Sequence, residues 1–216
     1  MLKVSCVYLQ LKLIESQKIL QGAASLFMRI GIKSVSMDDI AREVGISKKT
    51  IYKHFKDKKD LVHNVVMLDL EQDKTQFTAC YNTEHNAVQK MINISRNISH
   101  LHKDINPTVI YDLQKYYQSE WKVVQDFRTD FILKSVTENI EEGVIDGYYR
   151  KDIKTQIASH MYITLIEGMM EQLLDKNNNY NFQTLHLQMV TYHLNGICTK
   201  KGRNYLKLHI NEITNQ

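Results

Sequence analysis

A short segment rich in lysine and hydroxyl side chains is the strongest chemical feature of the sequence. Within seven residues it contains Lys48, Lys49, Thr50, Tyr52, Lys53 and His54. Ammonium and hydroxyl groups donate hydrogen bonds to phosphate oxygens and to base edges, so this set with an aromatic side chain among it suits a nucleic acid. Three more lysines follow directly, at positions 56, 58 and 59. The segment therefore predicts binding to a polyanion; the alternative is a basic, solvated helix hairpin without a partner.

The distribution of charge along the chain favours the same prediction. The 216 residues have a formal net charge of +4. Residues 1–60 contain 12 Lys and Arg against 6 Asp and Glu, whereas residues 61–216 have slightly more acidic than basic residues. Such asymmetry indicates that the first segment meets a polyanion and the rest does not. Plain solvated surfaces also show an excess of this size, so charge alone does not decide.

Neither catalysis nor metal binding is expected. The sequence contains no HExxH, Walker, GxSxG or GxGxxG motif. His100 and His102 would point about 200° apart on a helix, which makes a poor chelate. Cys6, Cys80 and Cys198 are widely separated, which argues against a disulfide framework. We therefore expect no catalytic residues, no metal and no cofactor.

Three short helices would position the basic segment. The first is indicated by apolar residues at steps of three and four, namely Ile19, Ala23, Leu26, Phe27 and Ile30, with Gly31 as its stop. Ser36 can cap a second helix that ends at Gly45, and the pair Asp38 and Asp39 suits its positive N-terminus. Ser47 can cap a third helix over residues 48–54.

The second and third of these helices must cross tightly because the turn between them is short. Such a crossing needs a small residue on the first helix, a residue that tolerates positive φ in the turn, and an inward apolar residue on the second. Ala41, Gly45 and Ile51 meet these three needs. This is the residue pattern of a helix-turn-helix.

Read with its neighbours, this pattern resembles the DNA-binding domain of the TetR family of dimeric, ligand-responsive repressors. The similar string covers about residues 16–62 and includes Ser36-Met37-Asp38-Asp39-Ile40-Ala41, Gly45-Ile46-Ser47 and Thr50-Ile51-Tyr52-Lys53-His54-Phe55-Lys56-Asp57-Lys58. The resemblance implies that residues 47–54 form the recognition helix in the major groove, that Tyr52 and Lys58 contact phosphates, and that Phe55 is core. The expected DNA-contacting residues are Ser36, Ser47, Lys48, Lys49, Thr50, Tyr52, Lys53, His54 and Lys58.

The rest of the chain is expected to be helical, because it has one proline and eight glycines and so few helix breakers. The prediction is an all-α fold, in which a helix-turn-helix domain (residues 12–62) is joined by a long helix to a C-terminal helical domain (residues 63–216). Helices are expected at 60–81, 84–103, 107–118, 119–145, 153–176 and 181–197. The apolar residues of the first thirteen positions alternate as in a strand. That segment is open to three interpretations: packing on the first helix, disorder, or sequence upstream of a shorter native protein.

The resemblance also implies a ligand pocket and a two-fold interface in the C-terminal domain. Pocket candidates are aromatic residues, a methionine and two polar residues on apolar faces: Tyr116, Tyr117, Trp121, Phe127, Phe131, His160, Tyr162, Glu167 and Met169. Candidates for the interface lie on the last two main helices: Ile157, Met161, Leu165, Leu185, Met189 and Leu194. The alternative for both sets is the core of a single copy.

These observations predict a sequence-specific DNA-binding transcriptional regulator, most simply a repressor that a small molecule releases from its operator. The alternatives are a transcriptional activator and an architectural DNA-binding protein without a ligand switch. The expected partners are double-stranded DNA with a pseudo-palindromic operator, a second copy of the chain and an unidentified small-molecule effector. No segment approaches 18 consecutive apolar residues and no signal peptide is evident, so we expect a cytoplasmic protein without membrane contact.

Overall fold

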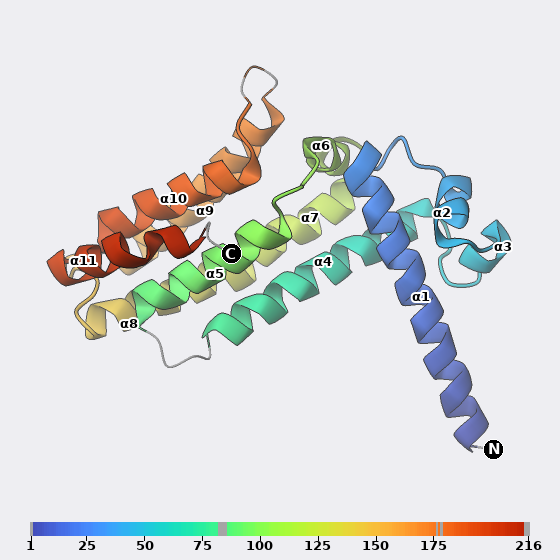
Figure 1. The fold of residues 1–216 in the computed structure, drawn as a ribbon, viewed down its shortest axis with the longest axis horizontal. Helices are drawn as coiled ribbons and strands as arrows, with labels where there is room; N and C mark the ends of the chain where they lie inside the picture. Colours follow the sequence, from blue (N-terminus) through green and yellow to red (C-terminus); the bar gives the residue numbers. More distant parts are fainter. Residues whose placement is uncertain (1, 82–85, 176, 178, 214–216) are drawn as a thin grey trace. The chain divides into compact units, whose positions relative to one another are not determined.

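The computed structural model describes residues 2–81, 86–175, 177 and 179–213, with side chains described from residue 12 to residue 211. Over these ranges the chain forms helices and loops, apart from one isolated antiparallel bridge between Tyr149 and Cys198 (Figure 1). The all-α fold class predicted from the sequence is confirmed. The helices are α1 (Leu2–Ile30), α2 (Met37–Val44), α3 (Lys48–Ile51), α4 (Lys58–Tyr81), α5 (Ala87–Leu101), α6 (Pro107–Tyr116), α7 (Gln118–Phe127), a π-helical turn η1 (Arg128–Ile132), α8 (Leu133–Ile145), α9 (Thr155–Leu174), α10 (Phe182–Ile197), α11 (Lys200–His209) and a 3-10 turn η2 (Ile210–Ile213).

Many of the helices begin at a side chain that accepts a hydrogen bond from a backbone N–H of the first turn. The residues that cap in this way are Ser36, Ser47, Asn86, Asn106, Asn181 and Thr199. Each such cap replaces a missing intrahelical partner and contributes about 1 kcal/mol. Pro107 occupies the first turn of α6, where it has no N–H to leave unpaired. Short polar signals of this kind decide where the helices start.

The described chain divides into two compact units. Unit 1 consists of Met1–Asp69 and Asn106–Lys122, and unit 2 consists of Leu70–Ile105 and Val123–Gln216. Helices α4 and α7 therefore each begin in unit 1 and end in unit 2. Each unit is described by itself below.

The core of unit 1 lies where α1 meets α2. The residues of α1 that were expected to share a face are buried, except Ile30, which is exposed. Gly31 ends the helix with φ of 83°, and its N–H donates to the carbonyl of Phe27 at 2.8 Å. Helix α6 belongs to the same unit, and its buried Asp112 accepts a hydrogen bond from the N–H of Lys33 at 2.7 Å. This contact anchors the loop that leads from α1 to α2.

The strand-like alternation of the first residues does not produce a strand. Residues 2–11 are helical and belong to α1, which runs without interruption to Ile30. Alternation over so few residues is a weak signal, and a helix that is already formed extends at little cost because each added residue gains one hydrogen bond.

Unit 2 is built around α5, α8, α9 and α10. At its centre Tyr149, fully buried, donates from its hydroxyl to Oδ1 of Asn139 at 3.0 Å. The amide of Asn139 donates in turn to the carbonyl of Ala87, the first residue of α5, at 2.9 Å. Gly143 of α8 faces the Tyr149 ring so closely that a Cβ there would overlap it. This chain of contacts ties α8 to α5.

The helix expected over residues 119–145 is helical but not uniform. It consists of α7, the π-helical turn η1 and α8, and the N–H of Leu133 donates to the carbonyl of Arg128, five residues earlier. One extra residue per turn rotates the faces of α7 and α8 relative to each other. Periodicity read across this turn therefore assigns faces incorrectly on one side of it.

None of the helices in the described ranges combines the length and apolar character that a membrane span requires.

Candidate nucleic-acid interface

Helices α2 and α3 form a tight helix-turn-helix. The N–H of Asp39 donates to Oγ of Ser36 at 3.1 Å, and the N–H of Ser36 donates to the Asp39 carboxylate at 2.9 Å, which closes a reciprocal cap. Gly45 ends α2 with φ of 75°, and both its N–H and that of Ile46 donate to the carbonyl of Ala41 at 3.0 Å. A side chain at position 45 would be strained in this conformation. The structure thus forms the cap at Ser36 and the turn at Gly45 that the sequence predicts.

Helix α3 is short and depends on its cap and on two buried residues. The N–H of Thr50 donates to Oγ of Ser47 at 3.1 Å. Ile51 and Phe55 are buried in the core of unit 1. Residues 52–54 continue as turns rather than as α-helix, so α3 is shorter than the predicted span of 48–54. A helix of this length is marginal alone, and its burial holds it in place.

The opposite face of this segment is basic and exposed. Lys48, Lys49 and Lys53 are exposed, and the Tyr52 ring is 46% exposed. Lys48 forms an ion pair with Asp38 of α2 at 2.7 Å, and this hydrogen bond raises the pKa of its ammonium group. The ammonium groups of Lys49 and Lys53 therefore offer the more direct contact to an anion.

His54 and Lys58 face inward instead. The His54 ring is only 4% exposed, and its Nε2 lies 2.8 Å from the Glu15 carboxylate of α1. The Lys58 ammonium donates to the carbonyl of Ile32 at 2.7 Å, and burial lowers its pKa. Both residues were expected to contact DNA. In the structure His54 instead binds α1, and Lys58 binds the loop that follows α1. Glu15 was not anticipated, because it lies 39 residues from its partner and no local pattern joins them.

Ser36 was also expected at the DNA surface, and it is exposed. Its hydroxyl takes part in the cap of α2, where Oγ donates a hydrogen bond to the Asp39 carboxylate at 2.6 Å. Thr50 is half-buried, and its hydroxyl lies 2.9 Å from that of Ser47. These hydroxyls stabilise the helix-turn-helix itself. The side chains available to a ligand are therefore those of the exposed basic face of α3.

The expected pocket residues do not form one group. Tyr116, Tyr117 and Trp121 belong to unit 1, and the other six belong to unit 2. Tyr116 is exposed and accepts a hydrogen bond from Lys33 at 2.9 Å, whereas Tyr117 and Trp121 are half-buried.

Within unit 2 the aromatic and methionine candidates are half-buried or buried, whereas the polar candidates are exposed. Phe127 and Phe131 stack with ring centroids 5.1 Å apart, and Tyr162 and Met169 are buried. His160 and Glu167 are exposed, and Nδ1 of His160 lies 2.7 Å from the carbonyl of Gln156 on its own helix. The expectation that these two polar residues orient a buried ligand is therefore wrong for this structure.

The expected interface residues divide by helix. On α9, Ile157, Met161 and Leu165 are 56, 62 and 40% exposed and lie one turn apart. On α10, Leu185 is half-buried, whereas Met189 and Leu194 are buried in the core of unit 2. The last two cannot contact a second copy in this conformation, because α10 turns that face toward its own unit.

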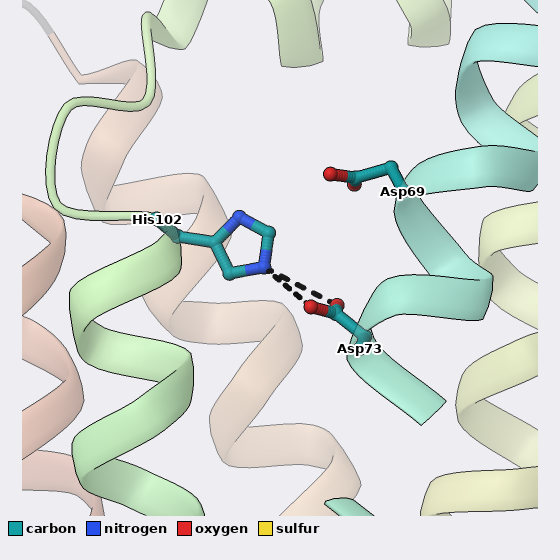
Figure 2. A group of neighbouring side chains, drawn as sticks. All are labelled: Asp69, Asp73 and His102. Atoms are coloured by element: carbon teal, nitrogen blue, oxygen red, sulfur yellow. Dashed lines mark hydrogen bonds and ion pairs between the residues drawn. The ribbon is translucent and has the colours of Figure 1, made fainter. Parts of the chain in front are cut away.

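A histidine and a carboxylate also meet at the end of α5. Nε2 of His102 lies 3.0 and 3.2 Å from the two carboxylate oxygens of Asp73. Figure 2 shows this pair together with Asp69, which lies one helical turn before Asp73 on α4. The direct hydrogen bonds explain the approach of Asp73 to His102. We assign the pair as a contact that joins α4 to α5 within unit 2.

Comparisons with known proteins agree with this geometry. A family model described as "Bacterial regulatory proteins, tetR family" matches residues 19–65. An HTH-type transcriptional regulator of Staphylococcus aureus (strain bovine RF122 / ET3-1) is 29% identical over 146 residues, which cover 57% of this chain and 78% of that protein. Among solved structures, a TetR-family regulator from Agrobacterium tumefaciens has a TM-score of 0.67 at 17% identity, covering 87% of this chain and all of that one. A gamma-butyrolactone receptor (ArpA-like protein) has a TM-score of 0.62 at 14% identity, covering 94% and 98%.

The helix-turn-helix geometry, the matched family model and the related regulators agree. The chain is a transcriptional regulator, and its residues 19–65 form a DNA-binding domain of the TetR family.

Proposed function

We propose that this regulator is a homodimeric repressor that a small molecule releases from a pseudo-palindromic operator. The observation that carries the proposal is the exposed basic face of α3, held on a capped and buried helix-turn-helix. Two such helices related by a two-fold axis would enter successive major grooves, about 34–36 Å apart or at another spacing set by the dimer. Such a protein acts in the cytoplasm, where its DNA lies.

The exposed side chains have distinct proposed roles. Lys53 and Tyr52 contact phosphates, while Lys49 and Lys48 reach base edges, with Lys48 exchanging its Asp38 partner for DNA. His54 and Lys58 act indirectly, since their side chains hold α1 and the loop that follows it in register with α3.

The ligand switch is proposed for the helical unit 2. One solved structure of the same fold is described as a gamma-butyrolactone receptor, which supports a ligand-binding role for this fold. A ligand would change the DNA affinity only through a difference between its affinities for the DNA-bound and the free conformation.

The first test measures DNA binding. Fluorescence anisotropy with the DNA upstream of the gene and with a scrambled duplex, at two salt concentrations, should show tighter and salt-sensitive binding to the native fragment. The variant Lys53→Ala should weaken binding to both duplexes, and it should flatten the dependence of log affinity on log salt by about 1 per half-site, because one phosphate contact is lost.

The matched control is Lys134→Ala, which removes an exposed lysine of α8. It should leave affinity and salt dependence unchanged. If both variants behaved alike, the loss would reflect net charge only, and the assignment of α3 would fail. Equal binding of wild type to the two duplexes would favour the architectural alternative, whereas reporter expression that falls on deletion of the gene would favour an activator.

A second test concerns the dimer. Ile157, Met161 and Leu165 form an exposed apolar stripe on α9, and Gly168 continues it with no atom within 4 Å of the position a Cβ would take. Met161→Glu should shift sedimentation from dimer toward monomer, because it buries an unpaired charge in the interface. Ile145→Glu, at an apolar residue of α8 that is even more exposed than Met161, should leave the dimer intact. If the Met161→Glu protein stayed dimeric, this stripe would not be the dimer interface.

A further inference from the structure

Four buried side-chain atoms of unit 2 have no hydrogen-bond partner. They are Oγ of Ser95 and Ser99 on α5, and Nδ1 of His186 and Nε2 of His193 on α10. Among the side chains that the structure describes, no other buried nitrogen or oxygen atom lacks a hydrogen-bond partner. Native proteins almost always pair such groups, because each unpaired one is costly. Their concentration on two helices that pack together indicates a common missing partner.

The four groups lie on two helices that pack together, α5 and α10, and we call the contact between these helices the seam. His102, directly after α5, contacts Phe182, the first residue of α10, with ring centroids 5.5 Å apart. Helix α5 therefore ends where α10 begins, and the two run in opposite directions (Figure 1). Ser99 and His186 each lie about one turn from this contact, while His193 lies two turns further along α10. The unpaired groups thus extend over about 10 Å of the seam.

The two serine hydroxyls are unusual for this chain. Hydroxyls inside helices commonly donate to the carbonyl four residues earlier. In unit 2 this bond is made by Thr75, Thr78, Ser135, Thr137, Ser159 and Thr164. Ser95 and Ser99 do not make it, although both are at most 1% exposed. Their hydroxyls remain available to a partner in the seam.

The seam has the character of a site for an uncharged molecule. Helix α10 contains no Asp, Glu, Lys or Arg. The two charged residues of α5 are engaged elsewhere, since Lys90 pairs with Glu142 at 2.7 Å and Arg96 donates to Asn93 at 3.4 Å. Burial lowers the pKa of both His186 and His193 to about 4, so both rings are neutral near pH 7. A neutral imidazole offers one donor and one acceptor, and a hydroxyl offers both.

We infer that the seam between α5 and α10 binds an elongated, uncharged small molecule with hydroxyl or carbonyl groups about 10 Å apart. One end bonds Ser99 and His186, with Ser95 alongside, and the other end bonds His193, whose ring packs against Tyr162 at 4.7 Å. A single ordered water bridges groups within one turn but cannot reach both ends. The inference rests on the proposed function, in which unit 2 carries the effector site.

Three probes with the same six-carbon chain test the charge selectivity. 1,6-Hexanediol is neutral with a hydroxyl at each end, adipate is a dianion, and 1,6-diaminohexane is a dication. In ¹⁵N spectra of the histidine-labelled full-length protein, hexanediol should saturably shift the imidazole signals of His186 and His193 at millimolar concentrations. The two charged probes should not. No shift with hexanediol, or equal shifts with all three probes, would overturn the inference.

Serine variants locate the contact. Ser95→Ala combined with Ser99→Ala should raise the hexanediol dissociation constant by about fivefold for each hydrogen bond lost. Ser135→Ala, at a buried serine of α8 whose hydroxyl donates to the carbonyl of Phe131, should not change the dissociation constant. Unchanged binding in the double variant would overturn the assignment of the seam. Anisotropy of operator binding without probes tests the proposed function separately. A failure of the proposed function can therefore be distinguished from a failure of the ligand site.

Discussion

Lowering the pH from 7 to 5 is expected to reduce the free energy of unfolding by roughly 4 kcal/mol through two histidines alone. His186 and His193 are buried, and desolvation is the main cause that lowers the pKa of each to about 4 from an ordinary value of 6.5. Between these values the unfolded chain binds protons that the folded chain excludes. Stability is therefore complete above about pH 6.5, falls as the pH drops through this window, and levels off near pH 4.

Urea denaturation at pH 7 and pH 5 measures this loss. His193→Phe should remove about half of the histidine contribution, because one of the two titrating groups is gone. His160→Gln, at an exposed histidine of α9, is the matched control and should retain the full pH dependence. If His193→Phe lost as much stability as wild type between the two pH values, carboxylates rather than buried imidazoles would dominate the acid response.

Gly143→Ala is expected to destabilise the protein by about 3 kcal/mol or more, since it overfills a closed part of the core. The added Cβ would lie well under 3.0 Å from three ring atoms of Tyr149. The ring cannot yield easily, because its hydroxyl is bonded to Asn139, and Asn139 is bonded to the carbonyl of Ala87. Moving it would leave buried polar groups unpaired.

The control is Gly196→Ala in α10, where no atom lies within 4 Å of the new Cβ. An alanine there should raise stability by about 0.5–1 kcal/mol, the usual gain over glycine inside a helix. Comparing the two midpoints of urea denaturation separates steric overlap from helix propensity. Equal stability of the two variants would show that the Tyr149 region adapts, contrary to the expected result.

Local sequence was sufficient to predict the helix-turn-helix. Capping at Ser36 and Ser47, the stop at Gly31 and the positive φ at Gly45 each involve atoms within about five residues of one another. A short pattern therefore contains all the interacting groups. The same reasoning predicted Pro107 at the start of α6 and the inward position of Ile51 and Phe55.

Which apolar or polar face of a helix meets a partner could not be predicted in this way. Met161 of α9 and Met189 of α10 looked alike in the sequence, yet the first is exposed and the second is buried. His160 was expected to be buried but is exposed, whereas His186 and His193, which were not singled out, are buried. Periodicity shows that a helix has distinct faces, but the neighbour that covers each face is distant in sequence.

The sequence by itself thus determined the class of fold, the helix-turn-helix and the basic character of its exposed face, because these depend on neighbouring residues. Only the tertiary structure decided that His54 turns toward Glu15 and that the Lys58 ammonium donates to the loop after α1. It also decided that four buried polar atoms on α5 and α10 are left unpaired. Each of these depends on a contact between residues that are far apart in the chain, and such contacts exist only once the helices have packed.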